Sequence, residues 1–194
     1  MAAAEPVETG AAPARPLRAD ARRNYERLIA EARSALTESG GDVSLEEIAR
    51  RAGVGIGTLY RHFPTRLDLL EAVYRDDVET LARSSETLVE SAPPWDALDT
   101  WLHLFIAYAA TKKVLFRELL DAVGKDSELL THSRQVINEC TAAVLTRAQQ
   151  AGVARADVQP TDLLRLVGGC TMMPHLEADQ QERMLQIVLD GIRT

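Results

Sequence analysis

Apolar residues recur at helical spacing along most of the chain. Between residues 45 and 52, leucine, isoleucine and alanine occupy positions i, i+3, i+4 and i+7, and the positions between them are charged. This spacing places the apolar side chains on one face of an amphipathic helix. We find no run of alternating apolar and polar residues, which would indicate a strand, and no internal repeat. The pattern therefore predicts an all-α protein with about nine helices.

Residues that stop helices divide this pattern into segments. Glycine and proline interrupt the apolar periodicity at 39–42, 53, 64, 91–94, 124, 152 and 160. The resulting helices are expected at 18–38, 45–52, 55–63, 65–90, 94–111, 113–123, 126–150, 161–173 and 179–193.

The stretch from residue 44 to residue 63 has the features of two short helices joined by a tight turn. Ser44 followed by Glu47 fits a capping box, in which the hydroxyl and the carboxylate satisfy backbone N–H groups at the helix start. Gly53 suits the left-handed residue that ends the first helix. Leu59 and Phe63, four residues apart, would face inward from the second helix. The spacing predicts a helix-turn-helix motif, although an unrelated amphipathic helix pair could produce a similar pattern.

The run IARRAGVGIGTLYRHFPTRLDLL resembles the DNA-binding signature of the TetR (tetracycline repressor) family, including its GTLYRHF core and the basic residue Arg66. The resemblance covers about a quarter of the chain. Gly55 stands where serine is frequent in the family, and Arg66 stands where lysine is frequent. The resemblance implies a homodimeric transcriptional regulator, usually a repressor, that a small-molecule effector releases from double-stranded operator DNA.

The outward face of the second helix carries several hydrogen-bond donors and little carboxylate, which suits phosphates and base edges. We expect Thr58 and Arg61, with Ile56 and Gly57, to meet base edges. The side chains expected to position the phosphate backbone are Tyr60, His62 and Arg66, with Ser44 in support.

The expected domains are a disordered arm at 1–16, a helix-turn-helix domain at 17–63, a linking helix at 64–90 and a ligand-binding and dimerisation domain at 91–194. The net charge of −7 does not exclude DNA, because its distribution is uneven. Residues 15–75 carry 11 basic and 9 acidic side chains, whereas residues 76–194 carry 11 and 18. Basic charge is thus concentrated near the DNA-reading segment. The arginines at the start of this region, within residues 15–23, either reach DNA or form a solvated basic face.

Aromatic, sulfur-containing and polar residues of the C-terminal part are candidates for an effector pocket, with ordinary core packing as the alternative for each. The pocket candidates are Trp101, His103, Phe105, Tyr108, Phe116, His132, Cys140, Met172 and Met173. The last two predicted helices carry more apolar residues than a helix at the protein surface needs. This favours a dimer interface over packing within one chain. The interface candidates are Leu163, Leu166, Val167, Cys170, Met184, Ile187 and Val188.

Several other classes of protein are not supported. Two cysteines do not make a disulfide framework, and the chain has no apolar run of about 18 residues, so we expect a cytoplasmic protein without membrane contact. The histidines and cysteines lack the close spacing of metal sites, and no nucleotide-binding or hydrolase motif occurs. We therefore expect no metal, no cofactor and no enzymatic activity. The alternatives are an enzyme or carrier that uses the C-terminal pocket, and an activator or a constitutive DNA binder without an effector.

Overall fold

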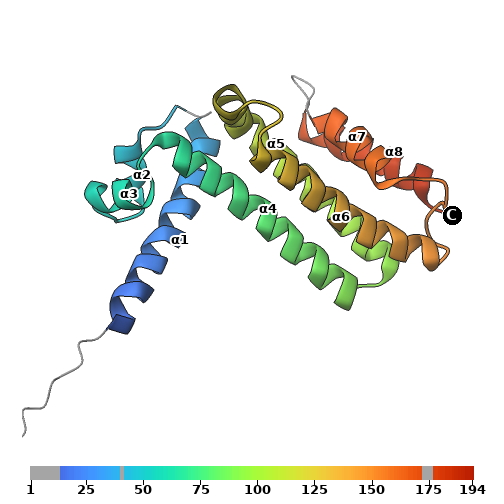
Figure 1. The fold of residues 1–194 in the computed structure, drawn as a ribbon. Coiled ribbons are helices and arrows are strands. Elements are labelled where there is room, and N and C mark those ends of the chain that lie inside the picture. Colours follow the sequence, from blue (N-terminus) through green and yellow to red (C-terminus); the bar gives the residue numbers. More distant parts are fainter. Residues whose placement is uncertain (1–13, 40–41, 172–176) are drawn as a thin grey trace, which may run out of the picture.

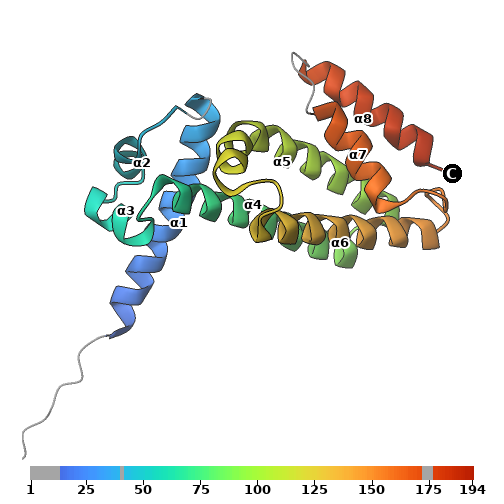
Figure 2. The same ribbon diagram turned by 45° about the horizontal axis from the view of Figure 1, so that its top comes forward.

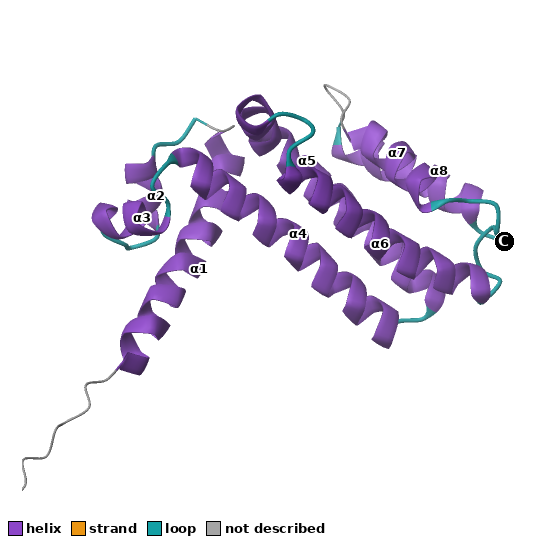
Figure 3. Cartoon of the chain, in the orientation of Figure 1, coloured by secondary structure: helices purple, strands orange, loops and turns teal. Residues whose placement is uncertain are grey.

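The computed structural model describes residues 14–39, 42–171 and 177–194. Within these ranges the chain forms helices joined by short loops, without a strand; the one β-bridge pairs Ala154 with Arg193 (Figure 3). The all-α prediction is therefore confirmed. The helices are α1 (Ala14–Ser39), α2 (Leu45–Arg51), α3 (Ile56–His62), α4 (Arg66–Ser91), α5 (Pro94–Val123), α6 (Glu128–Gln150), α7 (Pro160–Thr171) and α8 (Ala178–Ile192).

The helices form a small head at one end and a larger bundle at the other. Figure 1 shows α1, α2 and α3 gathered around the first turns of α4, with the N-terminal part of α1 extending away from them. From this head α4 runs along the bundle, where it packs against α5 and α6. The pair α7 and α8 lies at the far end of the bundle in both views (Figures 1 and 2). Helix α4 is therefore shared by the two parts.

Each part has its own hydrophobic core. The core of the head includes Leu28, Leu36, Ile48, Leu59 and Phe63, each at most 2% exposed. The apolar side chains of α1 are thus buried there, except that Tyr25 remains 38% exposed. The core of the bundle is larger and collects side chains from every helix from α4 to α8.

Local sequence explains where the helices of the head begin and end. The Ser44 hydroxyl accepts a hydrogen bond from the Glu47 N–H at 3.2 Å, which caps α2. The expected reciprocal bond from the Glu47 carboxylate is replaced by bonds from Arg50 and Arg51. Gly53 has a φ of 62°, a left-handed value that L side chains rarely adopt, so it turns the chain between α2 and α3.

A capping box stands at the start of the long helix α4. The Thr65 hydroxyl accepts from the Asp68 N–H, and the Asp68 carboxylate accepts from the Thr65 N–H at 2.8 Å. Both ends of the box are satisfied, so α4 has a defined origin immediately after α3.

Two expected boundaries were wrong. A helix break was predicted near residue 112, but α5 continues through it, because the Thr111–Lys112–Lys113 sequence contains neither glycine nor proline. The disordered arm was predicted to end at residue 16, whereas α1 already begins at Ala14. Pro16 is compatible with this because it lies in the first turn, where the N–H has no helical acceptor. The rest of the arm lies outside the described residues.

Candidate DNA-binding surface and regulatory cavity

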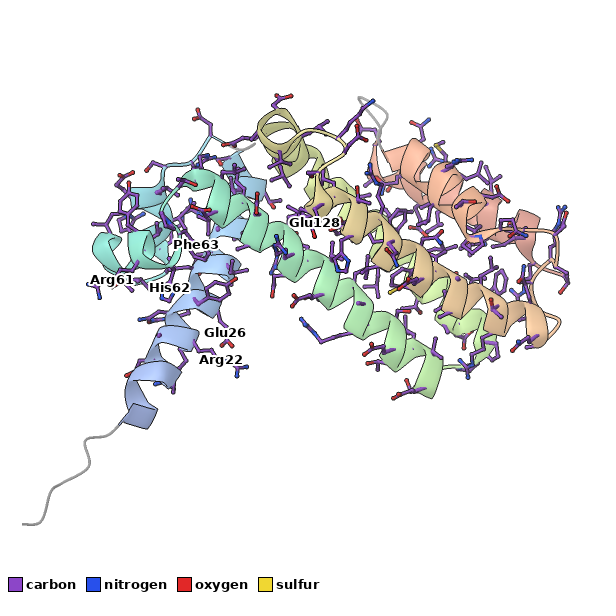
Figure 4. All side chains as sticks on the ribbon, in the orientation of Figure 1. Arg22, Glu26, Arg61, His62, Phe63 and Glu128 are labelled. Atoms are coloured by element: carbon purple, nitrogen blue, oxygen red, sulfur yellow. The ribbon has the colours of Figure 1, made fainter. Side chains whose placement is uncertain are left out.

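Helix α3 has a buried face, which anchors it on the core of the head, and an opposite face that is exposed to solvent. Leu59 is fully buried and Phe63 is 2% exposed, so both anchor the helix on the head core. On the opposite side Ile56 is 39% and Tyr60 is 44% exposed, so two large side chains of α3 face solvent. Figure 4 shows Arg61 projecting from the outer end of this helix. Gly57 is also exposed, and Thr58 is half-buried.

An aromatic cluster fixes the end of α3 against α1. The Tyr25 ring lies 5.9 Å from the His62 ring in an edge-on arrangement and 5.2 Å from the Phe63 ring, measured between centroids. Such contacts are favourable at these separations. His62 is therefore half-buried against α1, and its freedom to reach a phosphate is smaller than that of Arg61 (Figure 4).

Most arginines of the head are neutralised by acidic neighbours, but Arg61 is not. Glu47 accepts hydrogen bonds from Arg50 and Arg51, which together lower its pKa to about 2. Arg51 also bonds Glu38 on α1 at 2.6 Å. Among the described residues, no carboxylate lies within ion-pair distance of Arg61. The exposed α3 face thus carries a free cation, which a phosphate or a guanine edge could pair.

Arg66, expected at the phosphate backbone, connects the head to the bundle in this structure. Its Nε lies 2.6 Å and its Nη2 3.2 Å from the two carboxylate oxygens of Glu118 on α5. Its Nη1 also donates to the backbone carbonyl of Val43, just before α2. The guanidinium therefore contacts two separate segments, α5 and the loop before α2, and its proposed role at DNA requires it to give up at least part of this arrangement.

A second group of ion pairs joins α1 to α4. Arg33 Nε donates to Asp77 and Arg33 Nη2 donates to Asp76, each at 2.5 Å. Burial raises the pKa of Asp77, while the adjacent Arg33 opposes this shift. Because α4 continues into the bundle, these bonds make the position of α1 dependent on the position of α4.

A cavity of about 420 Å³ lies between α5, α6 and α7. This volume falls within the range of small-molecule pockets. Its lining combines three apolar residues with polar and basic ones: Phe105, Arg134, Gln135, Ile137, Asn138, Thr161, Leu164 and Arg165.

Only one of the predicted pocket residues with a described side chain, Phe105, lines this cavity. Trp101 is fully buried in the core, where its indole N–H donates to the Thr141 hydroxyl at 3.2 Å. Tyr108 lines a different hollow of about 280 Å³, beside Arg33 and Asp77.

The remaining pocket candidates lie elsewhere. His103 lies between Asp99 and Glu182 of α8, with its Nε2 3.2 Å from a Glu182 carboxylate oxygen. His132 is exposed and Cys140 is half-buried. Phe116, Met172 and Met173 lie outside the side chains that the structure describes.

The expected dimer residues fall into two groups. Leu163 and Val167 are at most 1% exposed and belong to the core of the chain itself. By contrast, Leu166 on α7 and Ile187 on α8 are 53% and 70% exposed. Met184 and Val188 are half-buried, and the Cys170 side chain is not described. An apolar surface is therefore left on α7 and α8, but it is smaller than the full predicted set.

The basic residues of the cavity were missed by sequence reasoning. Arg134 and Asn138 are four residues apart on α6, as are Thr161 and Arg165 on α7, so each pair lies on one helix face. That spacing could have singled out each pair. It could not have shown that the two faces meet, because their contact joins segments about one helix length apart in the chain.

Two further properties limit what the described residues can do. Among them, no three or more histidine, cysteine or acidic side chains come together as a possible metal site. No helix in the described ranges is both long enough and apolar enough to span a membrane.

Helix α3 is short and exposed, is anchored by a buried leucine, and follows a capped helix and a glycine turn. Together with the separate helical bundle, these features define a helix-turn-helix DNA-binding transcriptional regulator. Sequence comparison agrees with this class. Residues 28–73 match the family described as bacterial regulatory proteins, tetR family, and residues 93–194 match the SbtR-like transcriptional regulator C-terminal domain. The chain belongs to the TetR family, whose members are transcriptional regulators and not enzymes.

Solved structures and known relatives place the chain in the same family. It is 39% identical to a TetR regulator from Streptomyces coelicolor (TM-score 0.77), with 87% of this chain and 98% of that chain covered. A regulator from Mycobacterium vanbaalenii is 34% identical (TM-score 0.75), with 92% and 100% covered. An HTH-type transcriptional regulator of Staphylococcus aureus is 32% identical over 124 residues, and the match spans 62% of each chain.

Proposed function

We propose that this protein is a repressor that binds a palindromic operator as a homodimer and is released by a small-molecule effector. The observation that carries the proposal is the exposed face of α3, where Tyr60 and the unpaired Arg61 stand on a helix anchored by the buried Leu59. In a helix-turn-helix protein the second helix enters the major groove, and an arginine there can bond guanine through two hydrogen bonds.

The first experiment is selection of bound DNA from a random duplex library with the purified full chain, at two salt concentrations. A palindromic sequence should be enriched, with half-sites about 34 Å apart centre to centre. Its affinity should fall steeply with salt, because each phosphate contact releases counterions. No enrichment, or binding that is equal for all sequences, would contradict the proposal.

Variants of α3 make the test specific. Arg61→Ala should weaken binding to the selected operator by roughly 5- to 150-fold for each protomer, the loss expected for one bidentate base contact. The matched control is Arg83→Ala on α4, which removes an exposed arginine whose acidic neighbour Glu79 is 3.7 Å away. The control should bind the operator as the unaltered protein does. Equal affinities of both variants would remove Arg61 from the interface.

The exposed apolar residues of α7 and α8 support the homodimer. Leu166 and Ile187 project from adjacent helices that, in a two-fold arrangement with a second copy, would make a four-helix interface. Ile187→Glu should therefore convert the dimer to a monomer in sedimentation equilibrium. A monomeric unaltered protein would refute this part of the proposal.

Effector release is supported by the connections between bundle and head. Both Arg66–Glu118 and Arg33–Asp77 join the head to α4 or α5, so a ligand that shifts these helices also shifts the head. The shift can release DNA only to the extent that the ligand binds the shifted state more tightly. The cavity between α5, α6 and α7 is the candidate effector site.

A further inference from the structure

The cavity between α5, α6 and α7 is basic, whereas the part of the chain around it is acidic. Residues 76–194 carry 18 acidic side chains and 11 basic ones. Yet the lining of this cavity contains two arginines, Arg134 and Arg165, and no acidic residue. The cavity is thus basic within an acidic domain, and two guanidinium groups beside one cavity can bind an anion.

The two arginines face the cavity from different helices without a carboxylate partner. Arg134 Nη2 donates to the Lys125 carbonyl at 3.0 Å and to the Thr131 hydroxyl at 3.1 Å, which holds the guanidinium in place but does not neutralise it. Within the described ranges, neither Arg134 nor Arg165 forms an ion pair. Both side chains are exposed, which places them at the mouth of the cavity.

The interior of the cavity is apolar, apart from one amide. Phe105 is 8% exposed and Ile137 is 6% exposed, so both form an apolar floor. Beside them, the buried side-chain oxygen of Asn138 accepts no hydrogen bond from any residue that the structure describes. That oxygen has almost no accessible surface, so it lies behind the cavity wall and takes no part in the lining that a bound molecule would meet.

The cavity and the exposed apolar surface of α7 lie on different sides of that helix. Leu164 lines the cavity, whereas Leu166 is 53% exposed. Residues two apart in a helix point about 200° apart, so these side chains diverge. A dimer formed through Leu166 would therefore leave the cavity accessible.

We propose that the effector is an anionic amphiphile. Its small anionic group would lie between Arg134 and Arg165, and its apolar chain would lie over Phe105 and Ile137. Guanidinium groups bind carboxylates and phosphates through charge-assisted, often bidentate, hydrogen bonds. This inference rests on the proposed function only in calling the molecule an effector, since binding to the cavity does not require DNA.

The test is calorimetric titration of the full-length protein with probes that share an eight-carbon alkyl chain and differ in their terminal group. Octanoate and octyl phosphate should bind with one site per chain, and their ratio of affinities identifies the preferred anion. The neutral 1-octanol and the cationic octylamine should bind at least tenfold more weakly. If 1-octanol bound as tightly as octanoate, the cavity would be merely apolar and the proposal would be overturned.

Substitutions locate the binding site. Arg134→Gln and Arg165→Gln should each weaken octanoate binding roughly tenfold, as expected for one charge-assisted bond. Arg83→Gln, which removes the same charge outside the cavity, should leave it unchanged. Equal octanoate binding by all three arginine variants would show that the carboxylate of the probe does not bind in this cavity.

A second readout separates this inference from the proposed function. If octanoate binds in the cavity but no operator is enriched, the ligand site stands and DNA regulation fails. If an operator is bound but none of the anionic probes binds, the regulator stands and the ligand class is wrong. If both hold, octanoate should release the operator, and Arg165→Gln should require about tenfold more of it.

Discussion

Arg66 has two competing partners, and the competition can be measured by removing one of them. In the structure its guanidinium is engaged by Glu118 through contacts of 2.6 and 3.2 Å, while the proposed DNA complex needs the same group at a phosphate. Glu118→Gln keeps the size of the side chain but removes its charge. The substitution should therefore free Arg66 for DNA, and operator affinity should rise.

The size of the rise follows from the exposure of the pair. The Arg66 and Glu118 side chains are 29% and 43% exposed, so solvent screens much of their attraction and the ion pair contributes about 1 kcal/mol. That energy corresponds to an increase in affinity of about fivefold for each protomer. Two independent protomers would give an increase of roughly 25-fold for the dimer.

Fluorescence anisotropy of a labelled operator, titrated at several salt concentrations, measures both the affinity and its salt dependence. Arg66→Gln should weaken binding and lower the salt slope by about one for each protomer. In that background Glu118→Gln should have no effect, because the competition no longer exists. A loss of affinity in Glu118→Gln alone would refute the reasoning, and would mean that the pair holds the head in its DNA-binding orientation.

Three further predictions concern stability. Leu59→Ala removes a fully buried anchor of α3 and should lower the free energy of unfolding by about 2–5 kcal/mol, measured by urea denaturation. Gly53→Ala should cost about 1 kcal/mol in the same assay because its φ is 62°, whereas Gly55→Ala, at a φ of −64° with open space around it, should change stability by much less. For His103, burial lowers the pKa, but the hydrogen bonds to the Asp99 carbonyl and to Glu182 outweigh it, so the net pKa is raised. Its stabilising contribution is fully present below pH 6.5 and is lost as the pH rises through the folded-state pKa. The melting temperature should therefore fall less between pH 6 and 8 in His103→Gln than in the unaltered protein, by an amount equivalent to less than about 1 kcal/mol because the side chain is 39% exposed; an identical fall in both would contradict this assignment.

The head of the protein could be predicted from local sequence features. The cap at Ser44, the turn at Gly53 and the inward Leu59 are local features, each decided within a few residues of chain. A helix cap or a left-handed glycine depends on its immediate neighbours, and an apolar stripe depends on a spacing of three or four. The order of helices and the family resemblance could therefore be predicted before any tertiary contact was known.

Contacts between side chains of different helices could not be predicted in this way. Helical periodicity shows that Leu163 and Val167 are buried, but the same apolar face could pack within the chain or against a second copy, and here it packs within the chain. The engagement of Arg66 by Glu118 joins residues 52 positions apart. The cavity likewise depends on α6 and α7 presenting Arg134 and Arg165 to one space. Such contacts depend on how helices cross, and the spacing of residues within one helix carries no information about its partner.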